Sequence, residues 1–521
     1  MSAEGARFFF HGKLNLSGKR TEPEYCSRRA VDRPVKSSLE SVFVLKEVNV
    51  DVILQVVQTI NSYLSNYVLI ILLLGSGLFF SFRTHFVQIR CFGEGLKNLF
   101  GNFSLNGGKH KSGMSSFQAL ATAIAAQVGT GNIVGACGAI LIGGPGAIFW
   151  MWLIAFFGMA TNYAEAVLAQ KTRIVDEDGT IHGGPVYYIK TAFNNNLGKF
   201  FAAFFSIAII LALGFMGCMV QSNSIATTMH TAFGVPAWII GACVCAVAGF
   251  IFIGGLNRIA SVTEKLVPIM AIIYLIGGCV VLFMNGEQTL EAFKLIFYCA
   301  FNPQASIGGV TFGIIAALSQ GAKRGLFSNE AGMGSTPHAH ALANVKNPHD
   351  QGTIAIMGVF VDTFIVVTLT ALVVISSLYC GDGVLAQGLY EGVDKTNMAQ
   401  LAFASVFGTN IGYMFVAVCL LFFAFSTIIS WNLFSKINVE YLFGKKAVNV
   451  FSVLALIFIF AGSLLSNELV WELADMFNQL MVLPNVIGLI ALSGGVAMCA
   501  KTKGARFELK QQQKADEAEV K

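Results

Sequence analysis

The chain has 521 residues, of which 55% are hydrophobic and 12% are charged, and its formal net charge is +5. Soluble globular domains carry about 25% charged residues. The composition therefore excludes a soluble enzyme, a disordered chain and a nucleic-acid-binding protein, and it indicates a polytopic membrane protein.

The first 48 residues differ from the rest of the chain. They contain nine Lys and Arg side chains and no long apolar stretch, so they do not form a signal peptide. We expect residues 1–48 to be a disordered basic leader. Residues 49–500 are expected to form a single transmembrane domain, and residues 501–521 a polar tail.

Eleven apolar stretches after residue 50 are long enough to cross a bilayer, which takes about 20 helical residues. They predict an all-α polytopic membrane protein. The expected spans are 56–82, 115–141, 145–171, 197–229, 235–254, 260–285, 307–336, 353–378, 408–436, 446–466 and 469–499.

The loops between these spans predict the orientation, because Lys and Arg collect on the cytoplasmic side. One set of connections, together with the tail, holds 23 Lys and Arg residues, whereas the alternate set holds only Lys294 and Lys395. The C-terminus is therefore expected in the cytoplasm and the N-terminus outside. The basic leader would then have to cross the membrane, so we expect residues 1–48 to come from a start codon assigned too far upstream.

The second span, 115–141, has an interrupted interior. Gly129 and Gly131 lie at its centre beside Thr130 and Asn132, and glycine disfavours helix. Unwound backbone at membrane depth is tolerated where it is buried in protein or lines a cavity, and there its polar groups bind a carboxylate or a small cation. The alternative is that the glycines only let neighbouring helices pack closely.

The seventh span has an interruption at the matching position. Its apolar run stops at Ser319, Gln320 and Gly321, where we expect the helix to break. The two interrupted spans are five apart, which predicts two repeats of five spans in opposite orientation and favours a transport site. The expected parts are an extra helix over 56–82, a first repeat over 115–285 and a second repeat over 307–499.

Five motifs strongly resemble those of the alanine/glycine:cation symporter family. They are GTGNIVG (129–135), GGPGAIFWMW (143–152), GMATNYAEAVLA (158–169), GGPVYYI (183–189) and KRGLFSNEAGMGSTPHAHA (323–341). The resemblance covers about residues 50–500. It implies a LeuT-like fold with one extra helix before the inverted repeats. It also implies sodium-coupled, in some members proton-coupled, import of small neutral amino acids.

Three places depart from the usual motifs of that family. Cys218 replaces an Asn, Thr336 replaces an Ala, and residues 431–436 read WNLFSK where the family has WYYGER. The changes at Cys218 and at 431–436 bear on the preferred amino acid rather than on transport itself.

The substrate site is expected around the two breaks, where free amides would hold the carboxylate of an amino acid. Gln221 either hydrogen-bonds the substrate or braces the broken helix, because an amide in an apolar span is costly unless satisfied. Trp431 either limits the size of the substrate side chain or belongs to the interfacial belt. The expected substrate-binding residues are Thr130, Gly131, Asn132, Gln221, Ser319, Gln320, Gly321 and Trp431.

The resemblance also implies a sodium site. LeuT-like transporters cage sodium between carbonyls of the first broken helix and hydroxyls of a later one. On this chain the implied ligands are the carbonyls of Ala125 and Val128 and the hydroxyls of Ser426 and Thr427. The alternative is that the two hydroxyls only bond carbonyls of their own helix.

The intramembrane carboxylates Glu165, Glu330 and Asp362 are functional candidates. Asp362 either tunes cation binding or carries a proton, or it hydrogen-bonds backbone at a helix break. His338 and His340 have no Cys or carboxylate at metal-ligand spacing, and the eleven Cys are scattered. No metal besides sodium and no cofactor is therefore expected.

The favoured interpretation is a secondary active symporter in a bacterial-type cell membrane, in which sodium influx drives import of alanine or glycine by alternating access. The alternatives are a proton-coupled transporter of the same fold and, in a different class, a channel or a receptor. The sequence has no nucleotide-binding or catalytic motif, so neither an ATP-driven pump nor an enzyme is expected. It leaves open the stereoisomer, the stoichiometry and the oligomeric state.

A chain that starts near Val48 with an initiator Met is expected to insert and to take up labelled alanine as well as the full chain. The reason is that the leader's basic charge lies on the wrong side of the predicted topology. Membrane fractionation and uptake in cells check this, with a deletion that also removes 49–82 as the disruptive control. Failure of the shorter chain to insert would overturn the predicted topology.

Overall fold

The computed structural model describes residues 52–101, 113–177, 179–302, 305–465 and 468–504. The predicted leader and most of the predicted tail lie outside these ranges. The arrangement below concerns the compact unit that begins at Leu54.

Within the described ranges, eight helical segments are long and apolar enough to cross a membrane. They are Val52–Arg83 (including η1, Leu64–Val68, and α2, Leu69–Arg83), α7 (Gly146–Thr172), Asn196–Phe233 (α9, Asn196–Ile209; η3, Ile210–Gly217; α10, Cys218–Phe233), α12 (Gly255–Met284), Pro348–Leu378 (α16, Pro348–Val359; η4, Phe360–Val367; α17, Thr368–Leu378), α19 (Thr409–Phe443), α20 (Lys445–Leu464) and α21 (Glu468–Ala491). The η segments are π-helical turns, which are frequent at functional sites.

A ninth candidate is a bent pair, in which α5 (Ser116–Gln127) is followed by Gly131–Gly143 at an angle of 46°. The second part consists of η2 (Gly131–Gly135) and α6 (Ala136–Gly143).

The other helices are α3 (Val87–Arg90), α4 (Phe92–Gly101), α8 (Pro185–Ala192), α11 (Ala237–Ile253), α13 (Gly286–Phe301), α14 (Ile314–Asn329), α15 (Pro337–Ala341), α18 (Met398–Phe407) and α22 (Ser493–Thr502). Two antiparallel hairpins pair β1 (Ile174–Val175) with β2 (Ile181–His182) and β3 (Ala305–Ile307) with β4 (Val310–Phe312).

The expectation of an all-α polytopic membrane protein is confirmed, but the count of eleven spans is not. A helix occupies the place of each predicted span, yet α11 has 17 residues and α14 has 16, so both are shorter than the usual span. In α14 the reason is a break in the seventh predicted span.

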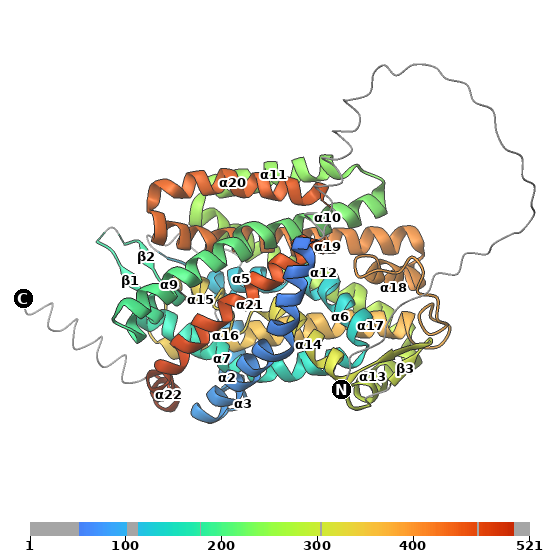
Figure 1. Cartoon of the computed structure of the whole chain (residues 1–521), viewed down its shortest axis with the longest axis horizontal. Helices are drawn as coiled ribbons and strands as arrows, with labels where there is room; N and C mark the ends of the chain where they lie inside the picture. Colours follow the sequence, from blue (N-terminus) through green and yellow to red (C-terminus); the bar gives the residue numbers. More distant parts are fainter. Residues whose placement is uncertain (1–51, 102–112, 178, 303–304, 466–467, 505–521) are drawn as a thin grey trace, which may run out of the picture. The chain divides into compact units, whose positions relative to one another are not determined.

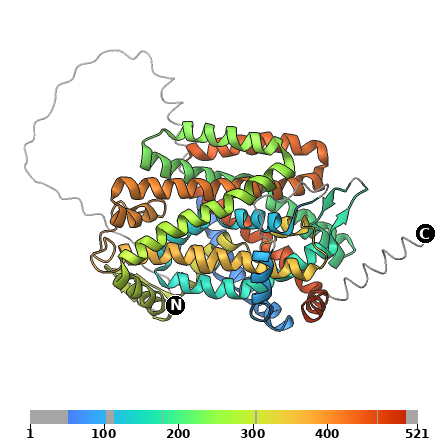
Figure 2. The same ribbon diagram turned by 180° about the vertical axis from the view of Figure 1, so that it is seen from behind.

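When the eleven predicted spans are counted in chain order, helices that lie five places apart pack against each other. The pairs are α7 with α16, α10 with α19, and α11 with α20. Figure 1 shows α11 and α20 side by side at one edge of the bundle, and Figure 2 shows α12 (yellow-green) crossing the bundle obliquely. Such pairing is what two repeats related by a pseudo-two-fold axis produce.

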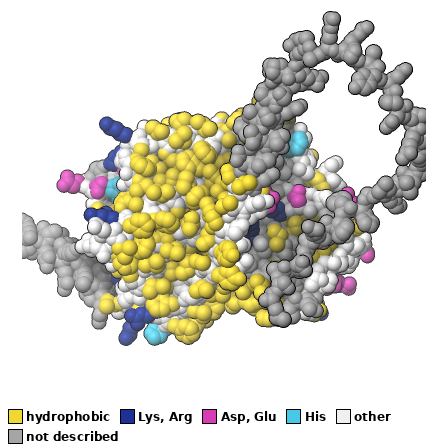
Figure 3. Space-filling model, in the orientation of Figure 1, with side chains coloured by type: hydrophobic (Ala, Val, Ile, Leu, Met, Phe, Trp, Pro, Cys, Tyr) yellow, Lys and Arg dark blue, Asp and Glu magenta, His cyan; other side chains and the backbone are white. Residues whose placement is uncertain are grey.

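The surface suits a lipid environment. A continuous field of hydrophobic side chains covers the visible face, and the charged side chains lie towards its two ends (Figure 3). Large apolar side chains that are exposed on the described part of the chain include Phe250, Ile253 and Val453. An apolar band of this kind is expected where helices meet lipid tails.

The second break lies elsewhere than the sequence predicts. Helix α14 continues through 319–321 to Asn329, and the chain unwinds only at Glu330, which adopts a left-handed conformation with a φ of 56°. Regular helix resumes at Pro337. The unwound segment is therefore 330–336, and the prediction of a break at 319–321 was wrong.

The three residues at the predicted break lie in regular helix and contact neighbouring segments, while their role in substrate binding stays a prediction. The hydroxyl of Ser319 donates to Asn66 Oδ1 at 2.5 Å. A Cβ on Gly321 would lie 2.6 Å from the Cβ of Trp150, so this glycine lets α7 approach α14. The side chain of Gln320 lies against α6, because a Cβ added at Gly143 would lie 3.1 Å from the Cβ of Gln320. The end of the apolar run thus marks helix packing.

Replacing Gly462 with Ala is expected to destabilise the protein. A Cβ there would lie 2.5 Å from Met219 Cα and 2.7 Å from its carbonyl oxygen, and this backbone of α10 cannot yield easily. Overpacking of this kind costs about 1–3 kcal/mol. Thermal unfolding of the purified protein measures the loss. Gly75→Ala, in exposed helix with no atom within 4 Å of the added Cβ, is the matched control and is expected to melt like the parent. Equal melting of both variants would contradict the packing argument.

Candidate functional site

The first broken helix ends in a turn that a single side chain closes. Helix α5 stops at Gln127, and Val128 takes an extended conformation with a φ of −81° and a ψ of 91°. The amide of Gly129 then donates to Asn132 Oδ1 at 2.9 Å, and the Asn132 amide donates back to the Gly129 carbonyl at 3.2 Å. Asn132 therefore satisfies backbone that the break leaves without helical partners.

Both glycines of this turn lie against other helices. A Cβ on Gly129 would lie 2.3 Å from Thr427 Oγ1, and one on Gly131 would lie 3.1 Å from the Phe327 ring and from Ser328 Cα. The glycines thus serve close packing and the helix break together. The two interpretations of the sequence do not exclude each other.

The four residues implied as sodium ligands meet at this break. The Thr427 hydroxyl lies 2.9 Å from the Ala125 carbonyl and 3.4 Å from that of Val128, and the Ser426 hydroxyl lies 3.4 Å from the Ala125 carbonyl. Both hydroxyls also bond the Phe423 carbonyl of their own helix, at 2.8 and 3.1 Å. Four neutral oxygens therefore lie together at the break, and the bonds to Phe423 are the ones that the alternative interpretation expects.

Gln221 on α10 braces the broken helix. Its Oε1 accepts from the Thr130 amide at 3.0 Å and from the Thr130 hydroxyl at 2.6 Å. Two amides of the turn, those of Gly129 and Thr130, thus have partners within the protein. A carboxylate that binds the Thr130 amide has to displace Gln221.

Asp362 lies in η4 and reaches both broken helices. Asn132 Nδ2 donates to Asp362 Oδ1 at 2.6 Å, and the Ser328 hydroxyl at the end of α14 donates to both carboxylate oxygens at 3.0 and 3.1 Å. The Thr363 hydroxyl donates to Oδ2 at 2.8 Å and accepts from Asn329 Nδ2 at 3.2 Å. All five side chains are fully buried.

The backbone of the second break is held by carboxylates. Glu165 on α7 accepts from the Gly332 amide at 3.2 Å and from Asn485 Nδ2 at 2.6 Å. Asn485 also donates to the Gly332 carbonyl at 2.9 Å. Glu330 accepts a short hydrogen bond from Ser335 across the unwound segment. Glu165 and Glu330 therefore have structural roles in the described part of the chain.

Trp431 is buried and lies beside the second break, so it is not an interfacial belt residue. Its Nε1 donates to Glu330 Oε1 at 2.5 Å. Its ring meets the Phe327 ring edge to face at 5.9 Å, and a Cβ on Gly217 would lie 2.5 Å from it. Trp431 and Phe327 thus form an apolar wall between α14 and α19.

Buried ion pairs adjoin this wall. Lys323 lies 2.9 Å and Arg324 3.1 Å from the Asp475 carboxylate on α21, and Lys323 is 3.3 Å from Glu472. The Trp471 ring packs on Phe327 at 5.6 Å. Lys323 and Arg324 are therefore interior residues of α14. The 23 Lys and Arg residues counted for the cytoplasmic side include these two, and that part of the count was wrong. A large Lys and Arg excess remains on the same side without them.

The residues that sequence reasoning missed share one property. Each contacts a partner on another helix, at least 34 residues away in the sequence, and no local pattern joins the two. The one available signal was that Ser328 and Asn329 directly precede a run containing two glycines. The missed residues are Ser328, Asn329, Thr363, Glu472, Asp475 and Asn485.

Comparison with known proteins supports the assignment to a family. Residues 50–520 match the model of the sodium:alanine symporter family. An uncharacterized transporter of Haemophilus influenzae is 41% identical over 84% of this chain and 93% of its own length. The sodium/alanine symporter AgcS of Methanococcus maripaludis is 40% identical over 84% of this chain and 95% of its own.

The fold is LeuT-like. The crystal structure of MhsT in complex with L-phenylalanine superposes with a TM-score of 0.53 at 13% identity, covering 76% of this chain and all of that one. At that identity the likeness concerns the fold alone. Together with the family match over nearly the whole transmembrane region, it means that the chain is a membrane transporter, not an enzyme, and belongs to the sodium:alanine symporter family.

Proposed function

We propose that this cation-coupled amino-acid symporter imports alanine or glycine and is driven by sodium influx through alternating access. The observation that carries the proposal is the contact between Thr427 and the carbonyls of Ala125 and Val128 across the first break. The 40% identity to a protein named as a sodium/alanine symporter supports it.

The proposed cation site suits sodium. Carbonyl and hydroxyl oxygens are hard ligands, as for the other hard cations. The four oxygens from Ala125, Val128, Ser426 and Thr427 are neutral, so the site attracts a monovalent ion without binding it too tightly for release. Binding requires the hydroxyl protons of Ser426 and Thr427 to turn away from the Ala125 carbonyl, so that their lone pairs face the ion.

The proposed substrate site adjoins the cation site on the same turn. Thr130, Gly131 and Asn132 would hold the carboxylate of the amino acid. Gln221 would have to release the Thr130 amide before the carboxylate could bind it. Trp431 would limit the size of the substrate side chain. The Val128 carbonyl and the Thr130 amide are two residues apart, so ion and substrate order the same backbone, and each is expected to raise the affinity for the other.

The proposed orientation places the C-terminus in the cytoplasm of a bacterial-type cell, as the loop charges indicate. In that orientation the Lys323 and Arg324 ion pairs close the outer side of the site. The unwound segment 330–336, with Glu165 and Asn485, lies towards the cytoplasm.

Proton coupling is the second candidate, and one observation favours it. Asp362 is a buried carboxylate that contacts both broken helices through Asn132 and Ser328. A proton on Asp362 would then take the place of sodium as the coupled ion.

Uptake by proteoliposomes tests the proposal. With the purified full chain, an inward sodium gradient is expected to drive accumulation of labelled alanine above its external concentration. A potassium gradient of equal size serves as the control. Accumulation driven only by a proton gradient would support the second candidate. Downhill flux that no gradient can concentrate would indicate a channel.

Thr427→Val is expected to weaken sodium binding, because it keeps the shape of the side chain and removes one ligand oxygen. By analogy with an unmade hydrogen bond of a buried group, the loss is about 1–3 kcal/mol. This corresponds to a roughly 5- to 150-fold lower sodium affinity. The apparent alanine affinity should therefore fall at low sodium and recover at saturating sodium, as measured by alanine binding across a sodium titration.

Thr231→Val is the matched control, because it makes the same exchange at an exposed position of α10, where the hydroxyl donates to the Thr227 carbonyl of its own helix at 2.9 Å. It is expected to behave like the parent. A Thr427→Val defect that stays constant at every sodium concentration would assign Thr427 to the amino acid instead. Unchanged binding would move the cation site elsewhere, with Asp362 next in line.

A further inference from the structure

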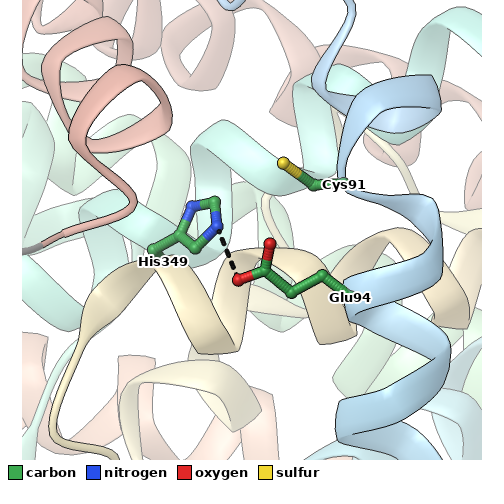
Figure 4. A group of neighbouring side chains, drawn as sticks. All are labelled: Cys91, Glu94 and His349. Carbon is green, nitrogen blue, oxygen red and sulfur yellow. Dashed lines mark ion pairs between the residues drawn. The ribbon is translucent and has the colours of Figure 1, made fainter.

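Three metal-ligating side chains meet away from the site described above. Cys91 follows α3, Glu94 lies in the first turn of α4, and His349 lies in the first turn of α16 (Figure 4). One ligand atom from each, Sγ, a carboxylate oxygen and a ring nitrogen, lies within 4.8 Å of the others. Two segments more than 250 residues apart thus bring three different donors together.

The His349 ring is held in place by Tyr163, and its other nitrogen faces Glu94. The side chain is fully buried, and its Nδ1 lies 2.7 Å from the Tyr163 hydroxyl. Its Nε2 faces Glu94 Oε1, with which it forms an ion pair at 3.4 Å (Figure 4). A metal-bound histidine usually has its second nitrogen fixed by such an outer partner.

Glu94 also has an outer partner. Its Oε2 lies 2.9 Å from Lys503 Nζ, whereas Oε1 faces His349. The carboxylate can therefore bind an ion through Oε1 while Lys503 keeps the other oxygen. The Glu94 side chain is 28% exposed, which gives an ion a path from solvent.

We propose that Cys91 Sγ, Glu94 Oε1 and His349 Nε2 form a binding site for a zinc-like transition-metal ion. Thiolate, imidazole and carboxylate are the usual zinc ligands, and water would complete the tetrahedron. The thiol proton leaves on binding, so the thiolate and the carboxylate together balance the two positive charges of the ion. Sodium does not suit this set, because a thiolate selects softer ions.

The site needs only small side-chain shifts. Zinc at about 2.0–2.3 Å from each ligand places the ligand atoms roughly 3.3–3.8 Å apart. The three ligand atoms lie within 4.8 Å of one another. Side-chain rotations that move each of them by about 1 Å would therefore bring them to the distances that zinc requires.

The bound ion would fasten α4 to α16. These helices already touch, since a Cβ on Gly95 would lie 2.7 Å from the Thr353 carbonyl and Asn98 Nδ2 donates to the Thr353 hydroxyl at 3.1 Å. Lys503, at the end of α22, joins the same cluster through Glu94. The inference goes beyond transport of an amino acid, and it does not depend on which ion drives transport.

Cobalt binding to the purified full chain, with any affinity tag removed, tests the proposal. One Co²⁺ per chain is expected to give a thiolate-to-cobalt charge-transfer absorption that Zn²⁺ abolishes. Cys91→Ser should lose this absorption. Glu94→Gln and His349→Asn should weaken binding by more than about tenfold, and Tyr163→Phe by about 10- to 100-fold, the usual cost of removing an outer partner.

Cys380→Ser is the matched control, because it removes another buried thiol, directly after α17. Its spectrum and affinity should equal those of the parent. Thermal unfolding confirms that each variant is folded, and His349→Gln replaces His349→Asn if the latter is not. A charge-transfer absorption that persists in Cys91→Ser, its absence in the parent, or equal affinity in the histidine variants would overturn the proposal. Metal binding is read without transport, so its failure is distinguishable from failure of the symporter proposal.

Discussion

The organising constraint of this molecule is that two stretches of helix backbone are unwound where no bulk water can satisfy them. Each unpaired backbone group in such a place costs several kcal/mol. The protein meets this cost with side chains from distant helices: Asn132 and Gln221 at the first break, Glu165 and Asn485 at the second. The buried polar side chains at the two breaks follow from this requirement.

The same constraint explains how two ligands can act on one another. The first break offers its carbonyls to α19 and its amides to α10, and it is linked through Asn132 to Asp362. Ordering the turn from one side therefore reduces the entropy still to be lost from the other. Coupling in this arrangement needs no long pathway, because the two proposed ligands share a few peptide units.

The sequence predicts the first break well because its cause is local. Two glycines in three residues interrupt an apolar run, and the structure bends there. The choice of Ser426 and Thr427 as sodium ligands rested on the family resemblance. In the structure their hydroxyls lie beside the Ala125 carbonyl, as expected. What could not be predicted depends on contacts between distant segments. In the sequence, Lys323 and Arg324 suggest that a membrane span ends before them. In the structure Asp475 pairs with both charges, so α14 continues past them in the protein interior. Cys91 likewise looks isolated until the fold brings His349 to it.

Helix α21 has a consequence for the order of assembly. It is the last long helix to be synthesised, yet it supplies Asp475 for the two basic side chains of α14 and Asn485 for Glu165 on α7. Until it emerges from the ribosome, earlier helices carry buried charges that lack their counter-charges, a costly state in a membrane. The buried polar contacts of the earlier helices therefore cannot all form before α21 has been synthesised. Premature termination shortly before α21 leaves an intermediate with uncompensated charge, the kind of defect by which membrane quality control recognises an unfinished protein.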